Sequence, residues 1–228
     1  MANDITVNLA TEGVKLATPL KLLILLTLLS LAPSLLIMLT TFVRIVIVLA
    51  LIRQAIGTPT IPPNQVIISL ALFLTFYIMY PIFNKVYNEA FLPYVKNEIT
   101  DDQFAKRAWE PIREFMLYNT QKSTLKVFMD MAKLPPKERT PEKIPWWVLV
   151  PAFMVSEIKT AFEIVFLLYL PFLVVDVVVA TILIGLGIFM LPPTVISLPL
   201  KIILFVLVNG WELLALALIK SYNIPPLH

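Results

Sequence analysis

The chain has 228 residues, of which 59% are hydrophobic and 14% are charged, and its mean hydropathy is +0.86. Soluble domains are roughly half apolar and about a quarter charged, so this composition indicates a membrane-associated protein. The formal net charge of +3 is small and spread along the chain, which excludes the clustered basic surface of a nucleic-acid-binding protein. The chain has no cysteine, no phosphate-cradling glycine motif and a single histidine at its C-terminus, His228, so we expect neither an enzyme nor a bound cofactor or metal.

An apolar run from Leu22 to Val43 follows a polar first segment. That first segment carries acidic residues, and the apolar run continues past Ala32 and Pro33, so we interpret it as an uncleaved spanning or hairpin helix and not as a signal peptide. Arg44 comes directly after it, within apolar sequence, where a charge is costly unless it faces protein or water. We interpret Arg44 either as an interface residue or as an arginine that extends to the lipid headgroups.

Gly57 and the prolines of residues 56–65 predict a turn, and a second apolar run covers residues 66–83. The composition then changes, because 20 of the 33 charged residues, 11 basic and 9 acidic, lie between Lys85 and Lys143. We therefore expect an all-α protein with three parts: an N-terminal apolar hairpin (1–83), a soluble, helical charged insert (84–145) and a C-terminal apolar hairpin (146–228).

Within the charged insert, Thr100 and Gln103 have the spacing of a helix capping box, and apolar residues follow at helical intervals. Pro111 is expected to restart or kink that helix. A further helix is predicted around residues 123–132, and a proline-rich linker then leads to Trp146 and Trp147, a pair that suits a membrane interface or a subunit contact.

The next predicted helix covers residues 151–170 and carries three charged residues. Lys159 and Glu163 are four residues apart and can pair on the helix surface. Glu157 has no partner three or four residues away, so its cation must come from a neighbouring helix or another subunit. We favour a contact between subunits for this cluster. A hydrated helix face, a proton site and a lipid-headgroup contact are the alternatives.

No residue between Asp176 and Lys201 carries a charge, and this stretch is long enough to cross a bilayer as a helix. Glycines and paired prolines predict a break near residues 188–191. If the chain folds back at 188–189, Asp176 and Lys201 reach the same height on antiparallel helices and can neutralise one another. The break is either a loop that lines a passage or a hairpin turn at the headgroups. The candidate loop residues are Gly185, Gly187, Ile188, Phe189, Met190, Leu191, Pro192 and Pro193.

Several segments closely resemble, in order, the FliP family of bacterial flagellar biosynthesis proteins, namely residues 56–66, 71–82, 111–117, 150–166, 170–180 and 191–211. The resemblance implies a channel-forming subunit of the flagellar type III export gate that passes unfolded flagellar subunits across the inner membrane. It also implies a pentameric ring with the family's Q and R proteins, next to other export-apparatus membrane proteins of the basal body. By the same resemblance, the subunits stack as tilted hairpins, much of them outside the bilayer.

The family typically has a glycine followed by three methionines at the channel constriction, and Gly187 to Met190 match this position. Only Met190 is retained; Ile188 and Phe189 imply a bulkier, stiffer apolar ring. The amino-acid sequence of residues 58–65 favours a flagellar over an injectisome gate. A small-solute transporter with an ion site at Glu157, Asp176 and Lys201 is the rival from another class, although no inverted repeat is visible. A membrane scaffold without a pathway is a third possibility. Arg44 and Arg53 flank the first connection between helices. Because connections that carry Lys and Arg tend to lie on the cytoplasmic side, this one is predicted to be cytoplasmic and the insert periplasmic.

Overall fold

A computed structural model describes residues 23, 26–27, 30, 33–34 and 37–224. Helices joined by turns make up this part of the chain, with no strand among the described residues, so the all-α prediction is confirmed. The predicted helix from Leu22 to Val43 lies partly outside the described residues, and its processing and His228 lie outside them. At the end of that run, residues 40–41 form a turn, and helix α2 begins at Phe42. The described residues from Met38 onward form one compact unit, to which the following description applies.

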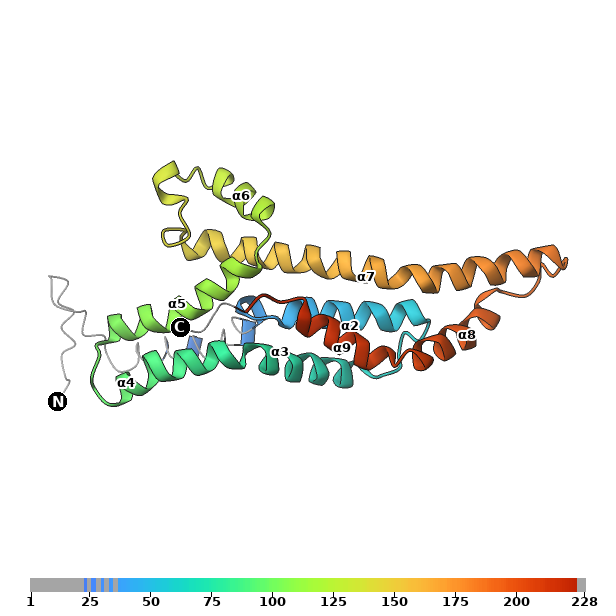
Figure 1. Cartoon of the computed structure of the whole chain (residues 1–228), viewed down its shortest axis with the longest axis horizontal. Coiled ribbons are helices and arrows are strands. Elements are labelled where there is room, and N and C mark those ends of the chain that lie inside the picture. The colour runs from blue at the N-terminus through green and yellow to red at the C-terminus, as the bar shows by residue number, and fades with distance from the viewer. Residues whose placement is uncertain (1–22, 24–25, 28–29, 31–32, 35–36, 225–228) are drawn as a thin grey trace, which may run out of the picture. The chain divides into compact units, whose positions relative to one another are not determined.

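The centre of this unit is α2 (Phe42–Ile56), which packs against α7 (Trp146–Gly185) and against α3 (Asn64–Val86) (Figure 1). Because α2 has neighbours on two sides, apolar residues are buried along a wide face of it, among them Ile45, Val48 and Leu49. The connection from α2 to α3 falls at the predicted turn. There Gly57 has a φ of +94°, a left-handed conformation that favours glycine.

The charged insert packs onto the apolar helices within the same unit. It contains a π-helical turn, η1 (Tyr87–Phe91), the short α4 (Leu92–Val95), α5 (Asp101–Asn119), α6 (Lys122–Met131) and a 3₁₀ turn, η2 (Pro136–Glu138). Both α5 and α6 contact α7. The capping box is confirmed, because Thr100 Oγ1 accepts from the Gln103 N–H and Gln103 Oε1 accepts from the Thr100 N–H.

Of the two outcomes predicted at Pro111, a restart of the helix or a kink, the restart is wrong. The helix is continuous from Asp101 to Asn119 although proline removes one backbone hydrogen bond. Pro111, Phe115 and Met116 are buried. Burial of this apolar face offsets the lost bond and keeps the two halves in one helix.

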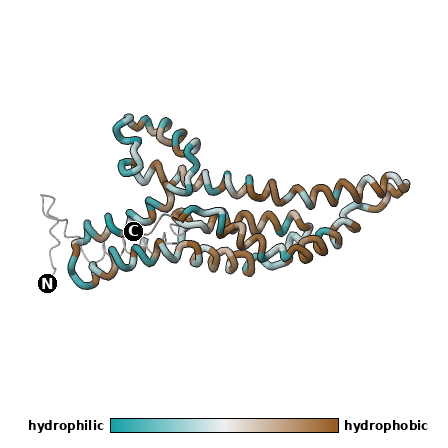
Figure 2. Tube along the Cα trace, viewed as in Figure 1, coloured by the Kyte–Doolittle hydropathy of each residue, from teal (hydrophilic) through white to brown (hydrophobic). Residues whose placement is uncertain are grey.

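Helix α7 is a single helix of 40 residues, about 60 Å at ~1.5 Å per residue, and begins at Trp146, five residues before the predicted start. A loop returns the chain to α8 (Thr194–Leu207), and α8 meets α9 (Gly210–Lys220) at an angle of 62°. The far end of α7 and α8 extends beyond α2, α3 and α9 (Figure 1). Hydrophobic residues dominate this hairpin, whereas hydrophilic residues gather in α5 and α6 (Figure 2).

Within the described part of the chain, two helical stretches, Asn64–Val95 and Trp146–Gly185, are long and apolar enough to cross a membrane, and the bent pair α8 and α9 would be a third. Together with the composition, these helices identify a membrane protein.

Candidate pore loop and buried ion pairs

The loop between α7 and α8 is built from a helix cap on one side and a proline pair on the other. Gly187 has a φ of +74° and donates its N–H to Ile184 O at 3.0 Å, while the Ile188 N–H donates to Leu183 O at 2.9 Å. These two bonds form a Schellman motif, which ends the helix with a left-handed residue that is usually glycine. Pro192 and Pro193 follow before α8 begins, where the missing N–H groups cost nothing. The loop therefore has a defined shape at both ends.

All the bulky apolar side chains of this loop are exposed, and Met190 is the most exposed of them. Met190 is 96% exposed and Phe189 is 76% exposed, and a Cβ added at Gly185 or Gly187 would meet no described atom within 4 Å. Several bulky apolar groups thus stand free at the end of the two-helix arm. A single chain leaves them uncovered, which is typical of a surface that meets another molecule.

Behind the loop, the predicted pair of Asp176 and Lys201 is confirmed. Lys201 Nζ lies 2.5 Å from Asp176 Oδ2, and Ser197 Oγ donates to Asp176 Oδ1 at 2.6 Å. Lys201 Nζ also lies 3.5 Å from Ala55 O, at the end of α2. Lys201 is buried and Asp176 is partly exposed. Charges withdrawn from water need both a partner and further hydrogen bonds, and this cluster supplies both. It joins α7 to α8 between the loop and the rest of the unit.

A second ion pair joins Arg44 of α2 to Glu157 of α7, and both residues are buried, at 2% and 0% exposure. Arg44 Nη1 also donates to Ser221 O at 2.9 Å and to Ser221 Oγ at 3.1 Å. The Tyr222 hydroxyl donates to Glu157 Oε2 at 2.8 Å, and the Arg44 guanidinium lies 3.9 Å from the centre of the Tyr222 ring. Ser221 and Tyr222, directly after α9, are thereby fixed between α2 and α7.

Two interpretations of these charges need correction. The partner of Glu157 is Arg44 of the same chain, so the contact between subunits that we favoured for Glu157 was wrong. The headgroup interpretation of Arg44 was also wrong, because the side chain is buried within the protein. The pairing of Arg44 also weakens the orientation argument, since a neutralised buried arginine does not act as a loop charge.

Lys159 and Glu163 form the predicted surface pair at 3.8 Å, with side chains about half exposed. Gln121, between α5 and α6, donates to Glu163 Oε2 at 3.3 Å and to Thr160 Oγ1 at 3.1 Å. An exposed pair of this kind contributes little to stability. Its neighbours indicate that it helps to orient the connection between α5 and α6 on α7.

The ion site of the rival transporter is not assembled in this arrangement. Glu157 and Asp176 belong to two different ion pairs and lie about 28 Å apart along α7, at ~1.5 Å per residue. Among the residues that the structure describes, no group of three potential metal ligands occurs. The arrangement shows two neutralised pairs, each holding helices together.

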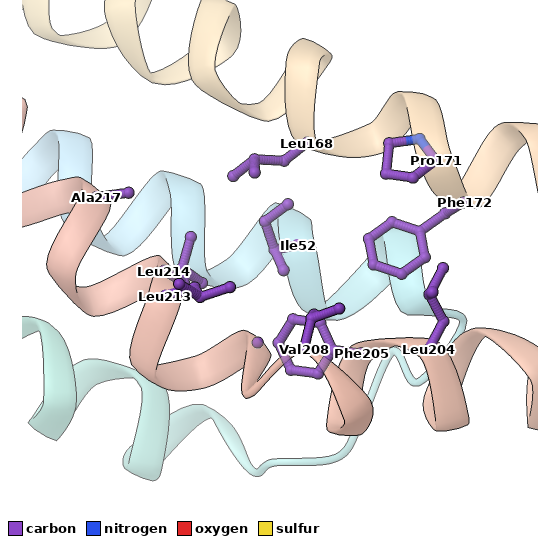
Figure 3. A pocket seen from close by; sticks show the side chains of 11 residues that line it. Ile52, Leu168, Pro171, Phe172, Leu204, Phe205, Val208, Leu213, Leu214 and Ala217 are labelled. Carbon is purple, nitrogen blue, oxygen red and sulfur yellow. The ribbon is translucent and has the colours of Figure 1, made fainter.

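A cavity of about 390 Å³ lies where α2, α7, α8 and α9 meet, and its lining is entirely apolar (Figure 3). Leu168 and Phe172 of α7 face Phe205 of α8 and Leu214 of α9 across it. No side chain of the lining can orient a polar ligand. The cavity marks a place where four helices do not pack closely.

Sequence reasoning missed Ser197, Ser221 and Tyr222, which complete the two charged clusters. Each is an ordinary polar residue near a helix end, and Tyr222 lies 65 residues from Glu157. Nothing local identifies them. The unpaired Glu157 was a usable signal that such partners exist, but not of which residues they are.

The chain matches the FliP family over residues 25–218. It is 59% identical to a flagellar biosynthetic protein FliP of Aquifex aeolicus over 93% of this chain and 89% of that protein. It is 48% identical to the FliP of Pectobacterium carotovorum over 96% of this chain and 84% of that protein, and 47% identical to the FliP of Bacillus subtilis over 97% and 100%, respectively. Membership of this flagellar family, anticipated from the resemblance, is confirmed: the chain belongs to the FliP family.

Proposed function

We propose that the chain is a channel-forming subunit of the flagellar type III export gate, in which the loop Leu186–Leu191 forms the constriction. One observation carries this proposal: bulky apolar side chains stand uncovered at the end of an arm whose two helices are joined by Asp176 and Lys201. When several copies converge, Ile188, Phe189 and Met190 form an apolar collar. A collar of this kind excludes water and ions while the channel is idle, since hydrophobic constrictions can close by dewetting.

The uncovered faces of other helices support an assembly of several copies. On α3, Phe73, Phe76, Tyr77 and Tyr80 recur at helical spacing and are all more than half exposed. Apolar surfaces of this extent mark contacts with protein or lipid. We propose that they are covered in a pentameric ring with the family's Q and R proteins, next to other membrane proteins of the export apparatus. The ring would pass unfolded flagellar subunits and has no enzymatic role.

The proposed location is the bacterial inner membrane, at the flagellar basal body, with the charged insert 84–145 on the periplasmic side. Lys137, in the exposed turn η2, is a suitable position for a protease-cleavable tag. Protease added to cells with a permeable outer membrane should cleave this tag. Cleavage that requires opening of the inner membrane would reverse the proposed orientation.

The collar is tested by the double change Phe189→Ala with Met190→Ala. We expect normal amounts of assembled complex and a leak of small ions through it, measured as membrane conductance. The matched control is Val206→Ala with Leu207→Ala, which removes similarly exposed apolar groups from α8 far from the loop and should not cause a leak. Unchanged conductance at normal assembly would refute the collar, whereas lower complex yield would show that the loop only packs.

A further inference from the structure

We propose that the end of the α7–α8 hairpin, residues 172–207, is a hinged arm that swings about Pro171 and the α8–α9 bend, with the apolar cavity as its free space. The effect of this movement on a channel rests on the proposed function, because the arm carries the candidate pore loop. Its geometry stands independently of that role.

Each helix of the hairpin has a position at the base of the arm where the chain can bend. In α7, Pro171 lies inside the helix, where proline removes a backbone hydrogen bond and allows a bend. At the end of α8, Val208 and Asn209 separate α8 from α9, and Asn209 adopts a left-handed conformation with a φ of +51°. Hinges commonly consist of a few such element-terminal residues. Two of these points, Pro171 and Val208, line the cavity.

Beyond the hinge points, the arm is held together as one body. It also contacts the base through Lys201 Nζ, which lies 3.5 Å from Ala55 O of α2, so a swing of the arm must break this long hydrogen bond. Asp176 binds Lys201 and Ser197 across the two helices, and Val179 and Leu183 are buried on the inner face of α7. These contacts couple the two helices, so a bend in one must be accompanied by a bend in the other. Below the hinge points, Arg44, Glu157 and Tyr222 fix the base.

The cavity supplies the space that such a bend needs. Leu168 of α7 and Phe205 of α8 face one another across about 390 Å³ lined by apolar side chains (Figure 3). Closely packed helices resist sliding and tilting, whereas helices around a cavity can approach one another without a clash. Gly185 lies about 21 Å along α7 from Pro171, so a bend of about 20° moves the loop by about 7 Å. A displacement of this size would widen an apolar collar.

Distance measurements on the purified full-length complex test the arm. The chain has no cysteine, so two introduced cysteines take spin labels without interference. Val195→Cys on the arm and Val127→Cys on the base are both more than half exposed. Labelled chains are diluted with unlabelled chains so that only distances within one chain are read. We expect a distribution several ångströms broader than that of two labels on the base, at Val127 and Tyr77.

Two substitutions should narrow this distribution, each by a different cause. Leu168→Phe fills the cavity, and Leu167→Phe is its matched control on the exposed side of α7. Pro171→Ala restores a backbone donor, and Pro151→Ala makes the same change far from the hinge. The hinged arm would be overturned if the distance distribution between labels at 195 and 127 were as narrow as that between the two labels on the base. It would also be overturned if neither test variant narrowed the distribution. Because no export is measured, this result is separate from the conductance test of the collar.

Discussion

The buried pair of Arg44 and Glu157 should be essential to stability even though removing both charges is tolerated. In the single variant Glu157→Leu, the Arg44 guanidinium keeps its bonds to Ser221 but loses its only counter-charge among the described residues, at 2% exposure. Breaking a buried pair in this way costs about 3–5 kcal/mol. For a protein of this size, each kcal/mol of lost stability lowers the midpoint temperature of unfolding by about 2–4 °C, so we expect this temperature to fall by about 6–20 °C.

The double variant Arg44→Met with Glu157→Leu should unfold at a higher temperature than either single variant. Both charges are then absent, and apolar groups of similar volume fill the site. The Tyr222 hydroxyl keeps an acceptor, because Thr41 O lies 3.0 Å from it. The midpoint temperature of unfolding is measured by tryptophan fluorescence on the purified complex, for the unchanged protein, the two single variants and the double variant.

The same cycle at the exposed pair, Lys159→Met with Glu163→Leu, is the control, and its coupling should not exceed about 0.5 kcal/mol. Additive losses at Arg44 and Glu157, with the double variant the least stable of the four, would refute direct coupling through the buried pair.

Three smaller changes test the local geometry. Gly210→Ala places a Cβ 2.3 Å from the Phe205 ring and should destabilise the complex by about 1–3 kcal/mol, with rescue by Phe205→Leu; an unchanged midpoint would mean that the ring moves aside. Gly187→Ala should cost about 1–2 kcal/mol because its φ is +74°, whereas Gly185→Ala, in open space within α7, should be neutral or stabilising; equal effects would contradict the helix cap. Thr100→Ala should cost about 1 kcal/mol, and hydrogen exchange at the start of α5 should rise; unchanged exchange would argue against the cap.

Local chemistry made much of this protein predictable from its sequence. The turn after α2, the capping box at Thr100 and the loop before α8 depend on glycine, proline and capping residues within a few positions, and each occurs where it was expected. The ion pair of Asp176 and Lys201 was also predictable, because a short loop between antiparallel helices determines which residues lie at the same height. Family resemblance then supplied the function, which no periodicity could have indicated.

Tertiary packing decided the rest. Arg44 and Glu157 are 113 residues apart, and only the packing of α2 on α7 brings them together. The continuity of α5 through Pro111 likewise depends on burial against neighbouring helices, which outweighs the local tendency of proline to restart a helix. The apolar cavity beside Pro171 depends on how four helices fail to fill the space between them. Sequence patterns act over a few residues, whereas these features arise from contacts between segments far apart in the chain.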